Sequence, residues 1–168
     1  MDSQDIIQKL TSEACLSLFS DYSLPLQAAE PSEQGPQTEL LFCSVIGFSS
    51  EKMRGTLVLA TTREPLGRTT PVKGGELREW VAELSNQLLG RVKRQLMDRG
   101  VELALSTPIV LRGERLAPMT SKEAAPLVFV CEGGCVCVWM DAVITPDLDL
   151  SQVQASEPGM GEGDAMLF

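Results

Sequence analysis

The feature that most constrains the fold is a long amphipathic segment that runs roughly from Gly75 to Arg99. Apolar side chains recur along it at spacings of three and four residues, which is typical of a helix with one buried face. The apolar arc consists of Trp80, Val81, Leu84, Leu88, Leu89, Val92 and Leu96. Such a helix is stable only when its arc packs against another element, so we expect it to lie on a sheet or on a second helix.

A short polar ridge, formed by Glu79, Glu83, Asn86 and Gly90, lies opposite this arc on the same helix. Glu83 and Asn86 are three residues apart and are therefore neighbours on the helix surface, with Glu79 one turn before them and Gly90 one turn after. A glycine inside a helix costs about 0.5–1 kcal/mol relative to alanine, so Gly90 calls for a reason. Close approach of a partner's backbone to the ridge would be one.

The segments on either side of this helix predict an α+β fold. Gln4 to Phe19 has the apolar spacing of a second amphipathic helix, with Asp2 or Ser3 as its cap. Five segments rich in β-branched and aliphatic residues are expected to be strands: Leu40 to Phe48, Gly55 to Thr61, Val101 to Gly113, Pro126 to Cys131 and Cys135 to Thr145. We expect a mainly antiparallel sheet covered on one face by the N-terminal helix and the long central helix.

The remaining segments are expected to be connections or a tail. Gln27 to Thr38 and Arg63 to Gly75 contain several prolines and glycines, so both are expected to be surface loops. Pro146 to Phe168 is acidic, has no sustained period and is expected to be a flexible C-terminal tail. Because one domain usually takes roughly 100–200 residues, we expect residues 1–145 to form a single domain before this tail.

Composition excludes several classes of function. The net charge of −9 would repel the phosphate backbone of DNA or RNA, so nucleic acid is not an expected partner. No stretch approaches the roughly 18 consecutive apolar residues of a membrane span, and the acidic start is unlike a secretory signal. We therefore expect no association with a membrane and a cytoplasmic location.

The residue types that are absent or rare limit the chemistry further. The chain has no histidine, which excludes His-dependent triads, His-ligated metals and imidazole acid–base catalysis. Asn86 is its only asparagine. Any mechanism that uses an asparagine carboxamide must therefore use this one.

Cysteine and tryptophan are better explained by packing than by chemistry. Cys131, Cys135 and Cys137 could suggest a metal site, but a fourth nearby ligand is missing. We expect them to be small buried residues and expect no metal site. We likewise expect Trp80 and Trp139 to fill the core between helix and sheet.

One part of the long helix, together with a later proline, matches a known pattern. The segment Glu83-Leu84-Ser85-Asn86 continues as Gln-Leu-Leu-Gly-Arg, and Pro108 follows 22 residues after Asn86. This pattern resembles the CheC, CheX and FliY family of chemotaxis phosphatases, whose signature is a helical Glu-x-x-Asn with a proline at about that distance. Members often have Asp or Ser where this chain has Glu79. CheC-like members carry two such motifs, which a single asparagine rules out, so the CheX-like branch with one site fits better.

The resemblance implies a reaction and a partner. Members of this family hydrolyse the aspartyl phosphate of a CheY-type response-regulator receiver, which itself supplies the phosphoryl group, a Mg²⁺ ion and a lysine. It implies that Asn86 orients the attacking water and that Glu83 anchors the receiver. Glu79, Gln87 and Gly90 lie beside this pair and are expected to form the contact rim. The resemblance also implies no cofactor of the chain's own, and a homodimer joined through sheet edges, for which the apolar C-terminal strands are candidates.

Two alternatives to the enzyme remain open at this point. The same ridge on the same fold could bind a receiver, or a second copy of the chain, without hydrolysis. The chain could also be a structural domain whose ridge is only hydrated.

Overall fold

The structure is a computed structural model that describes residues 1–30, 40–71, 76–116, 118–120 and 125–153. Its helices are α1 (Ser3–Asp21), α2 (Arg63–Thr69) and α3 (Leu77–Met97). Its strands are β1 (Gln27–Ala29), β2 (Leu40–Ser49), β3 (Met53–Thr61), β4 (Ala104–Leu105), β5 (Ile109–Glu114), β6 (Leu127–Cys131) and β7 (Gly134–Ile144). No helix within these described ranges has both the length and the apolar character that crossing a bilayer requires.

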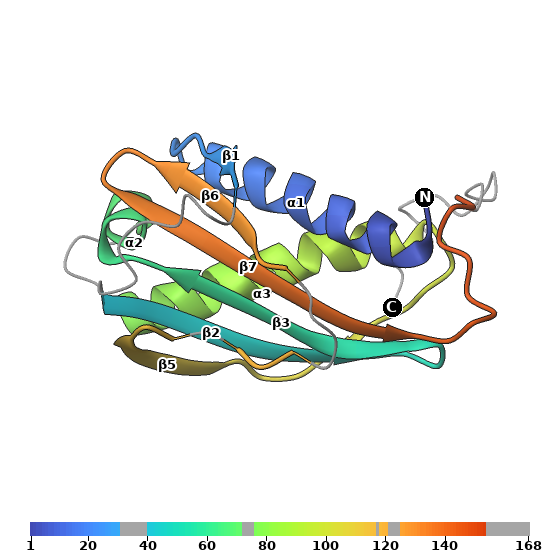
Figure 1. Ribbon diagram of the computed structural model, residues 1–168. Helices are drawn as coiled ribbons and strands as arrows, with labels where there is room; N and C mark the ends of the chain where they lie inside the picture. Colours follow the sequence, from blue (N-terminus) through green and yellow to red (C-terminus); the bar gives the residue numbers. More distant parts are fainter. Residues whose placement is uncertain (31–39, 72–75, 117, 121–124, 154–168) are drawn as a thin grey trace, which may run out of the picture.

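The strands form one sheet, with both long helices on the same side of it (Figure 1). The strand order is β1-β6-β7-β3-β2-β4, and β5 pairs with the part of β2 that β4 leaves open. All pairings among the described strands are antiparallel. The predicted α+β class, with a mainly antiparallel sheet under two helices, is therefore confirmed.

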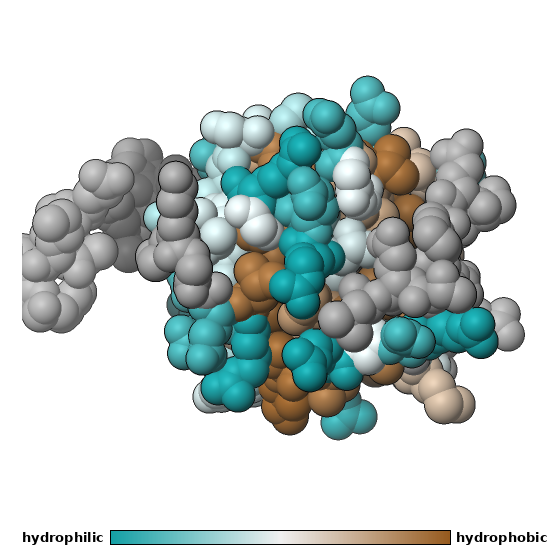
Figure 2. Space-filling view, turned by 90° about the vertical axis from the view of Figure 1, so that its left-hand side faces the viewer, coloured by the Kyte–Doolittle hydropathy of each residue, from teal (hydrophilic) through white to brown (hydrophobic). Residues whose placement is uncertain are grey.

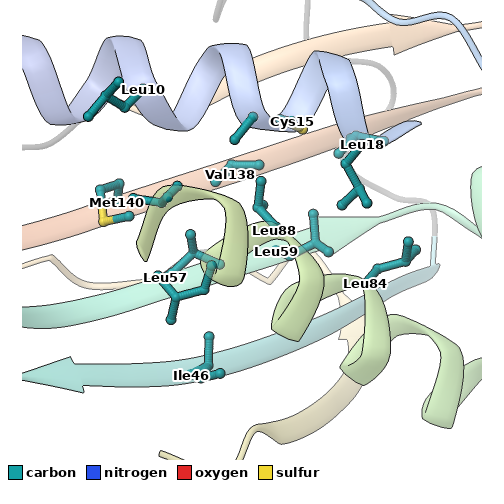
Figure 3. Packing of buried hydrophobic residues seen from close by; sticks show 14 of the residues in the cluster. Leu10, Cys15, Leu18, Ile46, Leu57, Leu59, Leu84, Leu88, Val138 and Met140 are labelled. Atoms are coloured by element: carbon teal, nitrogen blue, oxygen red, sulfur yellow. The ribbon is translucent and has the colours of Figure 1, made fainter. Parts of the chain in front are cut away.

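Helix α3 lies on this sheet with its apolar arc turned inward. All seven residues of the arc are buried, which confirms both the predicted helix and its inward face. In Figure 3, Leu88 of α3 lies beside Leu59 of β3, and both belong to one buried cluster with Leu84 of α3, Ile46 of β2 and Leu57 of β3. Full burial of a leucine contributes roughly 1.5–3 kcal/mol, so this contact holds the helix strongly on the sheet.

Helix α1 packs on the same face and is tied to β7. It begins with a capping box, in which the Asp2 carboxylate accepts a hydrogen bond from the Asp5 backbone N–H at 2.8 Å. The side-chain amides of Gln4 and Gln8 donate to backbone carbonyls of β7 at 2.9 and 2.8 Å. Helix α1 therefore covers the part of the sheet that α3 leaves open.

Two segments predicted as loops contain regular structure. The prediction for Arg63 to Gly75 was wrong in its first half, where α2 forms. Pro65 lies in the first turn of this helix, where a backbone N–H has no partner within the helix and proline is tolerated. The prediction for Gln27 to Thr38 was wrong at its start, because Gln27–Ala29 pairs with β6 as β1. The rest of that segment from residue 31 lies outside the described residues.

The predicted strand from Val101 to Gly113 is split into β4 and β5. Between them, the Ser106 backbone N–H donates to the Gly47 carbonyl at 2.9 Å, and the Ser106 hydroxyl accepts from the Gly47 N–H at 2.8 Å. Pro108 has no N–H with which to continue a ladder of hydrogen bonds. The pairing with β2 therefore stops at this proline and resumes in β5.

Trp139 lies on the sheet face opposite the helices, so its predicted place between helix and sheet was wrong. Side chains alternate along a strand, and its neighbours Val138 and Met140 face the helices (Figure 3). Trp139 is only 9% exposed, because a second apolar cluster surrounds it. The other buried members of this cluster are Cys43, Val58 and Ala60. Trp80, in contrast, packs in the main core as expected.

The packed part of the chain extends beyond residue 145, where the sequence placed the end of the domain. Leu150 is fully buried and Leu148 packs against the same core. The Arg99 guanidinium donates to the Leu150 carbonyl, and Lys52 pairs with Asp147 at 2.9 Å. The hydrogen bond from Lys52 lowers the pKa of Asp147 to about 2. Residues 154–168 of the predicted tail lie outside the described residues.

Gly55 offers a direct test of the close approach of β3 to β7. A Cβ at this position would overlap the Asp141 carbonyl oxygen and lie 2.8 Å from Cζ of Phe48. We therefore expect Gly55→Ala to lower the free energy of unfolding by about 3 kcal/mol, as measured by urea denaturation. Gly67→Ala is the matched control, since an added Cβ there meets nothing within 4 Å. A similar small effect of both substitutions would contradict this register.

Candidate functional site

The polar ridge lies on the part of α3 that faces away from the core. Glu79 and Glu83 are exposed, and Asn86 and Gly90 are half-buried. A Cβ added at Gly90 would meet nothing within 4 Å, so packing within the described chain does not require a glycine there. The structure thus brings the predicted site residues together on one accessible strip of helix.

A buried pair of serines holds α3 close to β2 beside the ridge. The hydroxyl oxygens of Ser85 and Ser44 are 2.6 Å apart, and Ser85 also donates to the Ala82 carbonyl at 2.9 Å. Ser85 stands directly before Asn86 in the chain and is fully buried. Successive side chains of a helix point about 100° apart. Because Ser85 points toward the sheet, the Asn86 side chain points away from it.

Asn86 has a carboxamide that the described structure leaves unused. Its side chain forms no hydrogen bond to any described residue. A carboxamide carries one acceptor oxygen and one donor NH₂ group, so both remain available for a water molecule or a partner. A side chain needs such a free acceptor or donor group in order to orient a water molecule.

Glu83 is held in place by a chain of polar contacts that reaches α1. The Gln87 amide donates to Oε1 of Glu83 at 3.0 Å, and the Tyr22 hydroxyl donates to the Gln87 carbonyl oxygen at 2.8 Å. Both polar ends of Gln87 are therefore occupied within the chain. The predicted role of Gln87 as a rim residue gains a second part, which is to orient Glu83.

The same chain of contacts continues to α2 through two aromatic rings. Tyr22 meets Trp80 edge to face, with ring centroids 5.0 Å apart. The Trp80 indole N–H donates to the Thr69 hydroxyl at 2.8 Å, and this hydroxyl donates to the Pro65 carbonyl at 2.7 Å. Residues from all three helices thus support one end of the ridge.

Pro108, the second part of the sequence pattern, lies near the same elements. It is half-buried between β4 and β5, both of which pair with β2. In the β2–β5 register, Val110 is opposite Ser44, the residue that contacts α3. The helical Glu-x-x-Asn and the later proline therefore lie on neighbouring parts of the fold, although they are distant in sequence.

Four of the five cysteine thiols have a raised pKa. Burial raises the pKa of Cys15 and raises that of Cys43 to about 11. The pKa of Cys131 is raised mainly by burial, and that of Cys137 mainly by its hydrogen bond with Cys135. Protonated thiols are poor zinc ligands. Among the described residues, no three Cys, Asp or Glu side chains are grouped so that they could hold an ion.

These observations define a class of protein, an antiparallel α+β domain that presents a Glu-x-x-Asn pair on its longer surface helix. No protein-family model matches the chain, and no curated protein matches it in sequence. Solved structures do resemble it. Chemotaxis protein CheX from Vibrio vulnificus superposes with a TM-score of 0.66 at 18% identity, covering 82% of this chain and 96% of that one.

Two further structures give the same result. A CheC-like chemotaxis protein from Shewanella oneidensis MR-1 has a TM-score of 0.65 at 18% identity, with 80% of this chain and 96% of that one covered. The CheX–CheY–BeF₃–Mg²⁺ complex from Borrelia burgdorferi has a TM-score of 0.61 at 16% identity, with coverage of 80% and 96%. The chain therefore has the CheX/CheC-like fold, which confirms the fold that the sequence pattern implied.

Sequence reasoning did not find two contributors to the site. Tyr22 is the only tyrosine of the chain, but nothing in its neighbourhood indicated a contact with a helix 65 residues later. Ser85 carried a usable signal, because at 100° per residue it lies inside the apolar arc, between the positions of Val92 and Leu96. Its partner Ser44 could be identified only from the register of α3 on β2.

Tyr22→Phe tests whether the contact with Gln87 supports the ridge. The substitution removes only the donating hydroxyl, so we expect the free energy of unfolding to fall by about 0.5–1.5 kcal/mol in urea denaturation. In a Gln87→Ala background the same substitution should cost clearly less, because the hydrogen bond is already absent. Equal costs in the two backgrounds would show that the contact does not contribute.

Proposed function

We propose that this protein accelerates hydrolysis of the aspartyl phosphate of a CheY-type response-regulator receiver. The observation that carries the proposal is the placement of Glu83 and the unused Asn86 carboxamide on the solvent side of α3, within a CheX/CheC-like fold. A structure with this fold, from Borrelia burgdorferi, contains CheX together with CheY, BeF₃ and Mg²⁺. A chemotaxis receiver is therefore the partner that best fits this surface.

In the proposed reaction a water molecule attacks the phosphorus atom of the receiver's aspartyl phosphate. The bond between phosphorus and the aspartate oxygen breaks, which releases the free carboxylate. The water oxygen becomes part of inorganic phosphate with one of its protons, and the other proton passes to solvent. The Mg²⁺ ion bound to the receiver would neutralise charge on the phosphoryl oxygens.

Asn86 would act by positioning the water. Its carbonyl oxygen can accept a hydrogen bond from the water and hold it in line with the breaking bond, as a glutamine does in GTPases. Such alignment matters because a displacement of about 1 Å can cost roughly 100-fold in rate. The chain has no histidine that could act as a base in its place.

Glu83 would anchor the receiver one turn away from Asn86. Its Oε1 accepts from Gln87, and its Oε2 has no hydrogen-bond partner among the described residues. A lysine of the receiver could therefore donate to Oε2 without breaking the bond to Gln87. Glu79 and Gly90 lie at the two ends of this contact and would form its rim.

The homodimer and the cytoplasmic location remain predictions. The C-terminal strands are not suitable for edge pairing, because β7 lies between β6 and β3 and β6 is itself paired with β1. A homodimer joined through sheet edges would have to use β1 at one side, or β4 and β5 at the other.

The proposal is tested by measuring the decay of phosphorylated CheY-type receivers from the same organism. We expect the wild type to accelerate the loss of phosphate and Asn86→Ala to reduce this acceleration roughly 100-fold or more. Asn86 lies outside the core, so its replacement should change the free energy of unfolding by no more than about 0.5 kcal/mol.

Gln95→Ala is the matched control for this experiment. Gln95 is an exposed carboxamide on α3 outside the ridge, so its loss should leave the decay rate unchanged. If the phosphorylated receiver loses its phosphate as fast with Asn86→Ala as with the wild type, Asn86 does not orient the water. If the wild type binds the receiver but does not accelerate decay, the chain is a non-catalytic binding module.

A further inference from the structure

Three arginines from separate parts of the chain line one open hollow at the start of α3. Arg63 stands at the start of α2, Arg78 in the first turn of α3, and Arg112 on β5. The hollow has a volume of about 570 Å³, and we call it the arginine hollow. Glu76 also lines it, and its apolar lining consists of Phe42, Leu77, Val110 and Leu111.

The three arginines have no carboxylate partner within the described chain. Arg68 and Arg91 pair with Glu64 and Asp21 at 3.0 and 2.5 Å, but none of the lining arginines forms an ion pair with a described residue. This is notable in a chain whose net charge is −9. Three arginines against the single carboxylate of Glu76 leave the lining with a net positive charge, so an anionic group bound there is favoured.

The apolar lining narrows the chemistry of that group. Cζ of Arg63 lies 5.5 Å from the centroid of the Phe42 ring, and Val110, on the same sheet face as Phe42, is half-buried. Figure 2, which faces this end of the molecule, shows hydrophobic surface beside hydrophilic surface toward its lower edge. A group that fills the hollow should therefore carry carboxylates for the arginines and an apolar side chain for the apolar lining.

The overall charge distinguishes a protein segment from nucleic acid. A long phosphate backbone would extend beyond the hollow and meet repulsion from a chain of net charge −9, whereas a short acidic segment can lie within this local surface. Arginine binds carboxylates through two parallel hydrogen bonds, so aspartate and glutamate side chains fit the three guanidinium groups.

We propose that the arginine hollow binds an acidic segment of a partner protein, with its carboxylates on the arginines and an apolar side chain against Val110. This site is separate from the polar ridge and needs neither Asn86 nor a phosphoryl group. Arg78 lies eight residues before Asn86, which is about 12 Å along the helix axis. A single partner on α3 could therefore contact both surfaces.

The test uses the full chain and a fluorescein-labelled peptide of the repeating sequence Asp-Glu-Leu. Fluorescence anisotropy should show saturable binding with a Kd below about 1 mM that weakens as salt is raised. The triple variant Arg63→Ala, Arg78→Ala, Arg112→Ala should bind at least about tenfold more weakly, which corresponds to about 1.4 kcal/mol. The control triple Arg54→Ala, Arg94→Ala, Arg115→Ala has the same net charge and should bind as the wild type.

A milder variant keeps the test decisive if the triple variant does not fold. Val110→Ala should weaken binding of the Asp-Glu-Leu peptide but not of an Asp-Glu-Ala peptide, because only the first has the larger apolar side chain. Four results would overturn the proposal. The first is that the peptide shows no saturable binding, and the second is that both triple variants lose the same amount of affinity. The third is that inorganic phosphate at an equal concentration displaces the peptide. The fourth is that peptide binding falls as the protein concentration is raised and the chain associates with itself.

Discussion

The contact between α3 and the sheet fixes the direction in which every candidate site residue points. Successive side chains of a helix are about 100° apart, so burying one arc determines the orientation of all the others. Leu84 and Leu88 pack over β2 and β3, and the Ser85–Ser44 contact adds a polar constraint within the buried arc. Asn86 and Glu83 reach solvent because these neighbours are buried. The ridge is thus a consequence of packing, and its chemistry depends on that packing staying intact.

The parts of the fold that the sequence predicted are those governed by local periodicity. The arc of α3 and the apolar face of α1 follow from spacings of three and four residues, which need no knowledge of distant contacts. Helix α2 was missed because Pro65 and Gly67 usually indicate a loop. Trp139 was placed on the wrong face because both faces of β7 carry apolar side chains, so no polar alternation indicated which one meets the helices.

In the candidate site, too, the features set by local periodicity were predicted and those set by distant contacts were not. The helix period alone predicted that Glu83 and Asn86 lie together outside the core. The period could not reveal the hydrogen bond from Tyr22 to Gln87, which orients the Gln87 contact with Glu83, since Tyr22 follows α1 and lies 65 residues away in the chain. Nor could it reveal the arginine hollow, whose three arginines meet only after α2, α3 and β5 have taken their places. Contacts between residues distant in sequence are the information that the structure adds.

The central claim is that Asn86 meets the phosphorylated site of a receiver, and its status as the only asparagine makes one measurement especially direct. Selective ¹⁵N labelling of asparagine side chains gives a single NH₂ signal in an NMR spectrum of the whole chain. We predict that this signal shifts when a CheY-type receiver activated with BeF₃ and Mg²⁺ is added, and that the inactive receiver has a much smaller effect. An unchanged signal in the presence of a complex would contradict the account.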